Sequence, residues 1–332
     1  MNLEPQDAIR LPAEALRGFA FRALHAAGLV PGRSELLARL LVENDLRGVN
    51  SHGTARLPRY CHDTREGTLN PDPAVRVVRE TPSSLLVDGD GGLGYFPAYE
   101  GTLRLIDKAL AEGIAVLMTR NHNHIGAAGI YSRMTLPHDL LCYVTSGHQL
   151  RLQPGDPIHA AAGGSPMSFS APAEEEAPLV LDFGAMHDLY RSDPHRDEIA
   201  ALAPGLVLRS IGLGVICQAW GGLLSGLTID PNASQRPWAG GNQGALIIAL
   251  RIDLFMDPAA YRREIDEYVR AAQRMAPLPG FQPYLPGGPE AEKEPRYTAE
   301  GIPIGEEHRR ELEGLADELH LRAPWLADQT ER

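Results

Sequence analysis

The chain has 332 residues, with 31 Lys and Arg against 43 Asp and Glu, and so carries a formal net charge of −12 at pH 7. This acidic balance argues against a nucleic-acid-binding protein, because phosphate binding needs clustered positive charge. Hydrophobic residues make up 43% of the sequence and charged residues 22%, so the chain can bury a sizeable core and disorder is not expected.

The cysteine content, the first residues and the apolar windows indicate where in the cell the protein is expected. The three cysteines are too few and too scattered for a disulfide framework or a Cys-x-x-Cys metal site. The first ten residues are acidic where a secretory signal peptide needs a basic start and an apolar run. The most apolar window, residues 206–224, is interrupted by Arg209 and Gln218, and we interpret it as a buried helix rather than a membrane span. We expect a cytoplasmic protein without membrane or nucleic-acid partners.

The N-terminal part, residues 1–70, shows helical periodicity. Apolar residues recur at spacings of three and four over residues 12–27 and again over residues 34–47, and a glycine follows each run. A third helix is expected to begin near His52, after a turn. These patterns predict a helical N-terminal part.

Residues 71–255 have a different texture, in which short apolar runs bounded by Gly, Pro or Asp alternate with helical patterns. The runs predict strands at residues 84–88, 114–119, 140–145, 179–182 and 245–252, and the helical patterns lie at residues 98–112 and 206–224. We interpret this part as one core sheet.

The C-terminal part, residues 256–332, is expected to pack back on the N-terminal part. It begins with a helical pattern at residues 258–274. Residues 277–303 are rich in Pro, Gly and Glu and predict an extended arm, and a last amphipathic helix includes Leu312 and Leu319. The fold class predicted for the whole chain is α/β of the mixed α+β kind, with a central mixed sheet between helical ends.

The glycine-rich segments do not match a common nucleotide-binding motif. No Gly-x-Gly-x-x-Gly follows a strand and opens a helix, so the ordinary Rossmann fingerprint is missing, and no P-loop is present. The segment Asp88–Gly94 has the wrong spacing for a Rossmann loop. Taken alone, it is more typical of a tight turn than of a phosphate cradle.

Ser51 and His52 follow a helix stop, and Arg56 and Tyr60 come shortly after them. If His52 opens a helix, Arg56 lies four residues on and on the same face. A carboxylate-bearing substrate suits such a pair, because Arg offers a bidentate fork and His exchanges a proton near pH 7. The alternative is a surface cap with a solvated arginine.

His122 and His124 follow an apolar run, where a strand is expected to end. Residues at positions i and i+2 of a strand share a face, so the two imidazoles could bind a metal, or one could act as an acid/base beside the other. No His-Glu-x-x-His motif and no cysteine partner supports a metal, and histidines in loops are usually only polar residues.

Several stretches resemble the type-2 malate/L-lactate dehydrogenase family, which includes ureidoglycolate, sulfolactate and diketogulonate dehydrogenases. The Ser51-His52-Gly53 sequence with Arg56 and Tyr60 is similar to the family's hallmark. Asp88–Gly94 and Asn123–Gly129 resemble its Asp-Gly-x-x-Gly-Leu-Gly and Asn-His-Phe-Gly stretches. The order of the matches is also that of the family.

The resemblance implies a non-Rossmann, NAD- or NADP-dependent oxidoreductase that forms a homodimer and acts on a small carboxylated substrate. By carry-over from the matched motifs, His124 is the proton donor or acceptor and Arg56 is the carboxylate clamp. His52, a neighbour of the substrate or of the nicotinamide, completes the catalytic set. Ser51, Tyr60 and His122 are then expected to bind the substrate. The positions expected at the cofactor are Ser165, Asp182, Gly184, His187 and Arg209; no metal is expected.

The chain departs from the family mainly in this cofactor half. Gly163–Pro166 replaces Gly-Thr-Asn-Pro, Asp182–Asp188 replaces Asp-Met-Ala-Thr-Ser, and Arg209-Ser210 replaces Lys-Gly. These departures motivate two alternatives to a divergent dehydrogenase. One is a lyase, isomerase or hydrolase that has lost the dinucleotide and uses the histidines, with or without a metal. The other is a catalytically silent binding relative.

Overall fold

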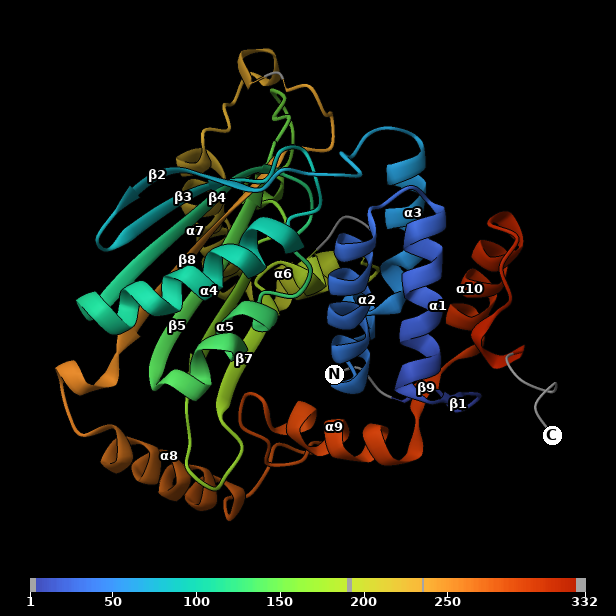
Figure 1. Cartoon of the computed structure of the whole chain (residues 1–332). Coiled ribbons are helices and arrows are strands. Elements are labelled where there is room, and N and C mark those ends of the chain that lie inside the picture. The colour runs from blue at the N-terminus through green and yellow to red at the C-terminus, as the bar shows by residue number, and fades with distance from the viewer. Residues whose placement is uncertain (1–3, 190–192, 235, 327–332) are drawn as a thin grey trace. The chain divides into compact units, whose positions relative to one another are not determined.

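The computed structural model of the chain describes residues 4–189, 193–234 and 236–326 (Figure 1). It divides into two compact units: unit 1 holds residues 1–72 and 288–332, and unit 2 holds residues 73–287. The first division lies close to the predicted boundary at residue 70. The boundary expected at residue 256 is not a division, because helix α8 (Pro258–Gln273) stays with unit 2.

Unit 1 is mainly helical. Helices α1 and α2 pack on each other, and Leu16, Phe19 and Ala23 form the buried face of α1 at the predicted spacing. The short strands β1 and β9 pair antiparallel and so join the two parts of the chain that build this unit. The regular elements are β1 (Ile9–Leu11), α1 (Ala13–Ala26), α2 (Pro31–Leu46), α3 (Leu57–Arg65), α9 (Gly288–Glu300), β9 (Ile302–Ile304) and α10 (Glu306–Glu318).

Two expectations for unit 1 are wrong. His52 does not open an α-helix: two 3-10 turns, Asn50–His52 and Thr54–Arg56, precede α3, and Gly53 between them has a non-helical ψ of −149°. The extended arm over residues 277–303 contains helix α9, because the Glu, Ala and Lys residues after Pro289 are good helix formers.

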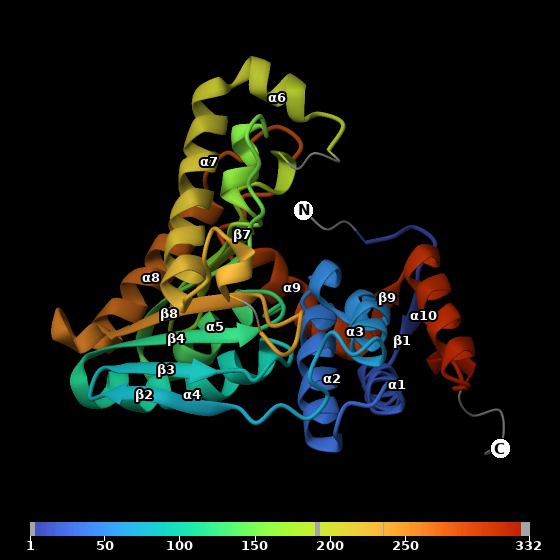
Figure 2. The same cartoon turned by 90° about the horizontal axis from the view of Figure 1, so that it is seen from above.

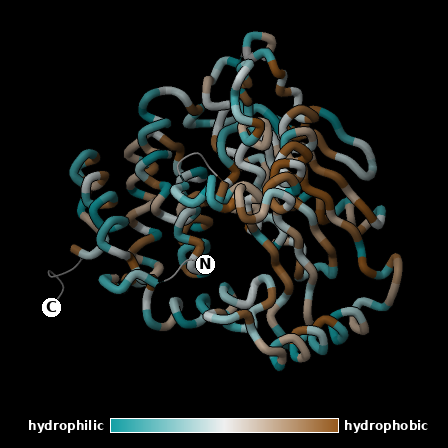
Figure 3. Tube along the Cα trace, turned by 180° about the vertical axis from the view of Figure 1, so that it is seen from behind, coloured by the Kyte–Doolittle hydropathy of each residue, from teal (hydrophilic) through white to brown (hydrophobic). Residues whose placement is uncertain are grey.

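Unit 2 is built on a seven-stranded sheet of order β2-β3-β4-β8-β5-β6-β7, in which β3 and β4 are parallel and the other pairs antiparallel. This confirms the predicted central mixed sheet. Figure 3 shows the strands as largely hydrophobic. The strands are β2 (Arg76–Thr81), β3 (Ser84–Asp88), β4 (Ile114–His122), β5 (Leu140–His148), β6 (Pro166–Ala171), β7 (Leu179–Gly184) and β8 (Gln243–Arg251).

The two faces of the sheet carry different helices (Figures 1 and 2). Helices α4 (Tyr95–Glu112) and α5 (Gly129–Thr135) cover one face, where a Cβ on Gly101 would lie 2.7 Å from Leu117. Leu117 pairs with Ile247, and Gly244, three residues away, therefore faces the opposite side. On that side a π-helical turn, Gln218–Gly222, contacts the sheet after α6 (Arg196–Leu202) and α7 (Pro204–Cys217).

The five predicted strands all exist, but β2 and β6 were not expected. Strand β2 lies at the sheet edge and is mostly exposed, so its sequence shows no apolar run. Strand β6 begins at Pro166 and carries serines whose hydroxyls are satisfied by tertiary contacts, as in the 2.7 Å contact between Ser168 Oγ and Ser132 Oγ.

The interpretation of residues 206–224 as a buried helix is wrong for most of its length. Within the described residues, the helical segment Pro204–Ser225 is the one that is long and apolar enough to cross a membrane, yet only 39% of its most apolar window is buried. Length and composition are weak criteria here, because core helices of soluble proteins pass them too. Leu208 is 67% exposed and Leu213 is 46% exposed.

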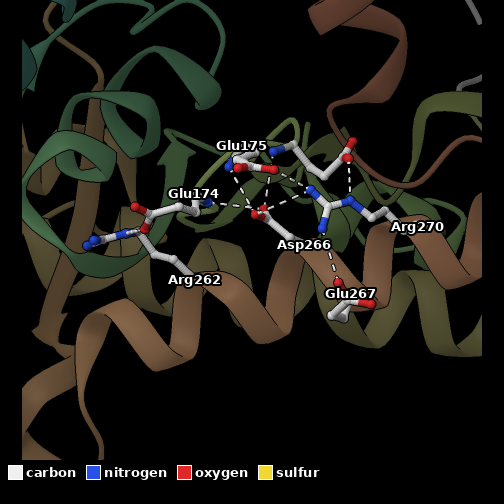
Figure 4. Close-up of polar contacts among 7 residues, drawn as sticks. Glu174, Glu175, Arg262, Asp266, Glu267 and Arg270 are labelled. Carbon is white, nitrogen blue, oxygen red and sulfur yellow. Dashed lines mark hydrogen bonds and ion pairs between the residues drawn. The ribbon is translucent and has the colours of Figure 1, made fainter.

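A charged network fastens helix α8 to the loop between β6 and β7 (Figure 4). Asp266 is 2% exposed and accepts the backbone N–H groups of residues 174, 175 and 176 at 3.0–3.1 Å. Burial raises the pKa of Asp266, but these hydrogen bonds and nearby Arg270 outweigh burial and lower it. The network therefore stabilises the end of the sheet that includes β7.

Candidate active site

The segment after α2 brings Ser51, His52 and Arg56 together in unit 1. Ser51 Oγ lies 3.0 Å from His52 Nδ1, and the Arg56 Nε–H donates to the Ser51 carbonyl oxygen at 2.7 Å. Ser51 and Arg56 are exposed and His52 is partly buried. The same-face geometry expected of one helix is replaced by a turn that places the guanidinium against the Ser51 backbone.

Arg56 also lines an open groove of about 600 Å³ within unit 1. Arg56 and Arg59 lie on one wall and Glu311 and Glu318 of α10 on the other. Arg59 is paired with Asp63 at 2.8 Å between Nε and Oδ2. The groove thus gives Arg56 a solvent-accessible position, while the charge of Arg59 is balanced by Asp63.

Tyr60 differs from the three residues before it. It belongs to helix α3, is only 2% exposed and contributes to the core of unit 1. Its carbonyl oxygen accepts the Thr64 hydroxyl at 2.8 Å. The structure therefore assigns Tyr60 a packing role in unit 1; its expected contact with a substrate stays a prediction.

His124 lies in unit 2, in the segment after strand β4. Its carbonyl oxygen accepts the Gly94 N–H at 3.0 Å, and the preceding Asn123 N–H donates to Gly92 at 2.9 Å. The Asn123 side chain donates to the Gly240 carbonyl oxygen at 3.0 Å. The glycine-rich loop and the strand end are thus hydrogen-bonded to each other. The backbone that carries the partly buried His124 imidazole is held by this loop on one side and by Gly240 on the other.

The pairing of His122 with His124 on one strand face is wrong. Strand β4 continues to His122, but its register shifts after Thr119 and Asn121 has a φ of +53°, so the alternation of side chains is broken. His122 is 0% exposed, with Nε2 2.7 Å from Thr119 Oγ1 and Nδ1 2.6 Å from the Asn123 carbonyl oxygen. Burial lowers the pKa of His122 to about 4. This neutral imidazole supports the loop from inside.

Close packing explains why the loop before α4 is rich in glycine. A Cβ on Gly94 would lie 2.4 Å from the Asn123 carbonyl oxygen and 2.6 Å from His122 Nδ1. A Cβ on Gly89 would lie 2.7 Å from His122 Cβ. The loop is neither an isolated tight turn nor a phosphate cradle of the Rossmann kind: it is the surface on which the His124 segment rests.

The positions expected at a cofactor all lie in unit 2, around strands β6 and β7. Pro166 pairs with Gly184, so Ser165 and Gly184 are neighbours, and the Ala185 N–H donates to the Ser165 carbonyl oxygen at 3.2 Å. Asp182 is two residues along β7 and accepts the Gly129 N–H at 2.9 Å. These three expected residues are therefore brought together.

The segments that carry His187 and Arg209 pack against each other near the end of β7. Met186 and Leu189, which flank the His187 turn, share a buried cluster with Val207 and Ile211 of α7. His187 is 80% exposed at its side chain, and Arg209 is exposed on α7. Among residues 4–189, 193–234 and 236–326, no group of three or more His, Cys, Asp or Glu side chains is arranged to hold a metal ion.

Three residues that shape the site were not singled out from the sequence: Asp45, Thr54 and His308. Asp45 and Thr54 lie on either side of the Ser-His-Gly motif. They differ from ordinary polar residues in being fully buried, which the sequence does not show. His308 is 254 residues from Thr54 in the chain, so no local pattern could join them.

The chain belongs to the malate/L-lactate dehydrogenase family, whose model matches residues 11–186 and 191–313, and it is therefore an oxidoreductase. It is 26% identical to the L-sulfolactate dehydrogenase of Methanocaldococcus jannaschii over 97% of this chain and 98% of that protein. It is 25% identical to the ureidoglycolate dehydrogenase (NAD(+)) of Escherichia coli K12, over 89% of this chain and 93% of that one. The structure of malate dehydrogenase from Pyrococcus horikoshii OT3 matches with a TM-score of 0.80 at 26% identity, covering 97% of this chain and 98% of the other.

Proposed function

We propose that this chain is a nicotinamide-dependent dehydrogenase that interconverts a small 2-hydroxy (or amino/imino) acid and its 2-oxo form. The observation that carries the proposal is the family match over both units, together with a histidine at position 124 held by hydrogen bonds from the glycine-rich loop. The ureidoglycolate dehydrogenase relative is named for NAD(+), which favours NAD over NADP as the cofactor.

The residues of unit 2 suit a dinucleotide. Arg209 is an exposed cation for a phosphate group, and Asp182 is an exposed carboxylate of the kind that accepts ribose hydroxyls. Ser165 has a φ of +46°, and its buried Oγ has no hydrogen-bond partner among the described residues. His187 and Gly184 complete the proposed set at the turn after β7.

The residues proposed to contact the substrate have two tasks: one group binds its carboxylate, and one histidine transfers a proton. Arg56 holds the substrate carboxylate, and Ser51 and His52 complete the binding surface for that end of the molecule, with the buried Tyr60 packed beneath it. His124 donates a proton to the carbonyl oxygen during reduction and takes it back from the hydroxyl during oxidation. His122 supports His124 through the Asn123 backbone. When bound, the nicotinamide supplies or accepts the hydride.

Titration of the purified protein with NADH and NADPH, followed by nicotinamide fluorescence, tests the cofactor assignment. We expect saturable binding, with NADH preferred. No fluorescence change at millimolar cofactor would contradict the dehydrogenase. It would favour the alternative of a lyase, isomerase or hydrolase that acts on a carboxylated substrate without a dinucleotide, and metal analysis of the same sample would then test a His-bound metal.

We also propose a homodimer in which a second copy covers helix α7. Its apolar side chains Leu206, Leu208 and Leu213 are 54%, 67% and 46% exposed. Leu223 and Leu224 extend the same apolar helix and are also exposed. Leu206 and Leu213, seven residues apart, share one face of α7, and exposed apolar side chains gathered on a folded chain are typical of a protein interface.

A further inference from the structure

The turn that carries His52 and Arg56 is fastened to a buried carboxylate outside the proposed catalytic set. Asp45, in the last turn of α2, is 0% exposed. Its Oδ2 accepts the Thr54 N–H at 2.9 Å and the Thr54 hydroxyl at 2.6 Å. One carboxylate oxygen therefore closes a loop between two residues nine positions apart, and this loop contains both Ser51 and His52.

The backbone of His52 itself is also held by a hydrogen bond from α2. The Asn44 side-chain N–H donates to the His52 carbonyl oxygen at 2.9 Å. Gly53, between the two anchored residues, passes so close to the carboxylate that a Cβ there would lie 1.8 Å from Asp45 Oδ1. Any side chain at this position would displace the Asp45 carboxylate from Thr54, so the glycine of the Ser-His-Gly motif suits the place that Asp45 occupies.

A third element joins this arrangement through Thr54. His308 of α10 lies with Nε2 3.2 Å from Thr54 Oγ1. When Asp45 is ionised, the Thr54 hydroxyl gives its one hydrogen to the carboxylate, and His308 can then donate its Nε2–H to the hydroxyl oxygen. The chain from Asp45 through Thr54 to His308 thus links α2, the turn and α10 within unit 1.

The charge of this buried group is set by its surroundings. Burial raises the pKa of Asp45 to about 7, although the two hydrogen bonds from Thr54 oppose the shift. Burial lowers the pKa of His308 to about 4, so it is neutral at pH 7 and offers no compensating charge. Asp45 Oδ1 has no hydrogen-bond partner among the described residues.

The other charged groups around the end of α2 come from the turn and from α9. His52 and Arg56 belong to the turn itself. Lys293 lies against Gly48, and Arg47 pairs with Glu294 at 2.9 Å. None of them is hydrogen-bonded to the Asp45 carboxylate in any contact described, so Thr54 is its direct partner.

We propose that Asp45 is a positioning residue that holds the turn Ser51–Arg56 in the conformation that presents His52 and Arg56 to the substrate. Asp45 touches no substrate; it acts through Thr54, with His308 as the outer support. Because ionised acceptors form the stronger hydrogen bonds, the ionised carboxylate holds Thr54 more tightly than the neutral acid. The substrate-binding part of this inference rests on the proposed function, whereas the anchoring of the turn does not.

Hydrogen exchange at the Thr54 amide measures the anchor without any ligand. In Asp45→Ala, we expect exchange at Thr54 to be roughly 10- to 100-fold faster, because a hydrogen bond to a charged group is lost. Asp45→Asn keeps an acceptor oxygen and should restore much of the protection. Asp266→Asn, which alters an equally buried carboxylate in unit 2, serves as the matched control and should leave Thr54 unchanged. Unchanged Thr54 exchange in Asp45→Ala would overturn the proposal.

Kinetics of the full-length enzyme then test what the anchor does for substrate. We expect KM for the 2-oxo acid to rise at least roughly tenfold in Asp45→Ala with a smaller change in kcat, since binding of the carboxylate is shared by ground and transition states. The pH profile of KM should contain an inflection near pH 7 that Asp45→Asn lacks. A lower kcat in Asp45→Ala with an unchanged KM would contradict a positioning role.

A second pair of variants keeps the test decisive if Asp45→Ala does not fold. Thr54→Val removes the hydroxyl that joins Asp45 and His308, and Thr54→Ser retains it. Raised KM in Thr54→Val but not in Thr54→Ser supports the proposal, and equal KM values in the two variants overturn it. If the wild-type protein turns over no 2-oxo acid at all, the proposed function fails, and the exchange measurements still decide whether Asp45 anchors the turn.

Discussion

Asn121 donates a side-chain hydrogen bond to Asp88, at 2.8 Å between Nδ2 and Oδ1. The same carboxylate accepts Arg120 Nε at 3.0 Å and the Asp90 N–H at 2.9 Å. Burial raises the pKa of Asp88, but these donors outweigh it and lower the pKa, so the group stays ionised at neutral pH. This contact ties the start of the glycine-rich loop to the strand end that leads to His124.

Replacing His124 by alanine tests its proposed role as acid and base. In His124→Ala we expect kcat/KM to fall roughly 10²–10⁴-fold, because proton transfer to the carbonyl oxygen is lost. Steady-state assays over pH 5–9 measure this. His138→Ala, at an exposed histidine of the same unit, is the control. Unaltered turnover in His124→Ala would remove the assignment.

Adding a single methyl group at Gly94 should disturb the same site without touching the imidazole. The new Cβ would lie 2.4 Å from the Asn123 carbonyl oxygen, so the loop or the His124 segment must move. We expect Gly94→Ala to lower the free energy of unfolding by about 1–3 kcal/mol, as overpacking does. Urea unfolding measures it. Gly32→Ala in α2, where no atom lies within 4 Å of the new Cβ, should not destabilise the protein.

Acidification should destabilise unit 2 through His122. Its pKa is about 4 in the folded state against 6.5 without burial, so the unfolded chain binds a proton first as pH falls. The contribution of neutral His122 to the free energy of unfolding is complete above pH 6.5 and is lost as pH falls from 6.5 towards 4. At pH 5 the loss is about 2 kcal/mol. Urea unfolding at pH 7.5 and pH 5 should show a smaller loss in His122→Gln than in the wild type; equal losses would refute the linkage.

Charge placed on α7 should separate the proposed dimer. Leu206→Lys together with Leu213→Lys puts two cations, seven residues apart, on one helix face that we expect a second copy to bury, where an unpaired charge is costly. Sedimentation velocity should show a dimer for the wild type and a monomer for this variant. Leu278→Lys, at a 74% exposed leucine outside α7, should remain dimeric. A monomeric wild type would contradict the proposal directly.

Local patterns were sufficient for much of the fold. The spacing of Leu16, Phe19 and Ala23 predicted α1, and the run at residues 114–119 predicted the core of β4. Periodicity did not predict β2, an exposed edge strand, or α9, whose Pro and Glu residues suggested an extended chain. Edge strands and polar helices lack a buried face, so hydrophobic spacing carries little information about them.

For the site, the sequence determined which residues are present, and tertiary structure decided what each one contacts. The Ser-His-Gly and Asn-His motifs were recognisable from their order in the chain. Only the fold shows that His122 is enclosed and that Asp45 and Thr54 meet, and it joins Asp88 to Asn121 across 33 positions. The physical reason is that burial and hydrogen bonding are set by residues distant in sequence, whereas residue type and spacing are local.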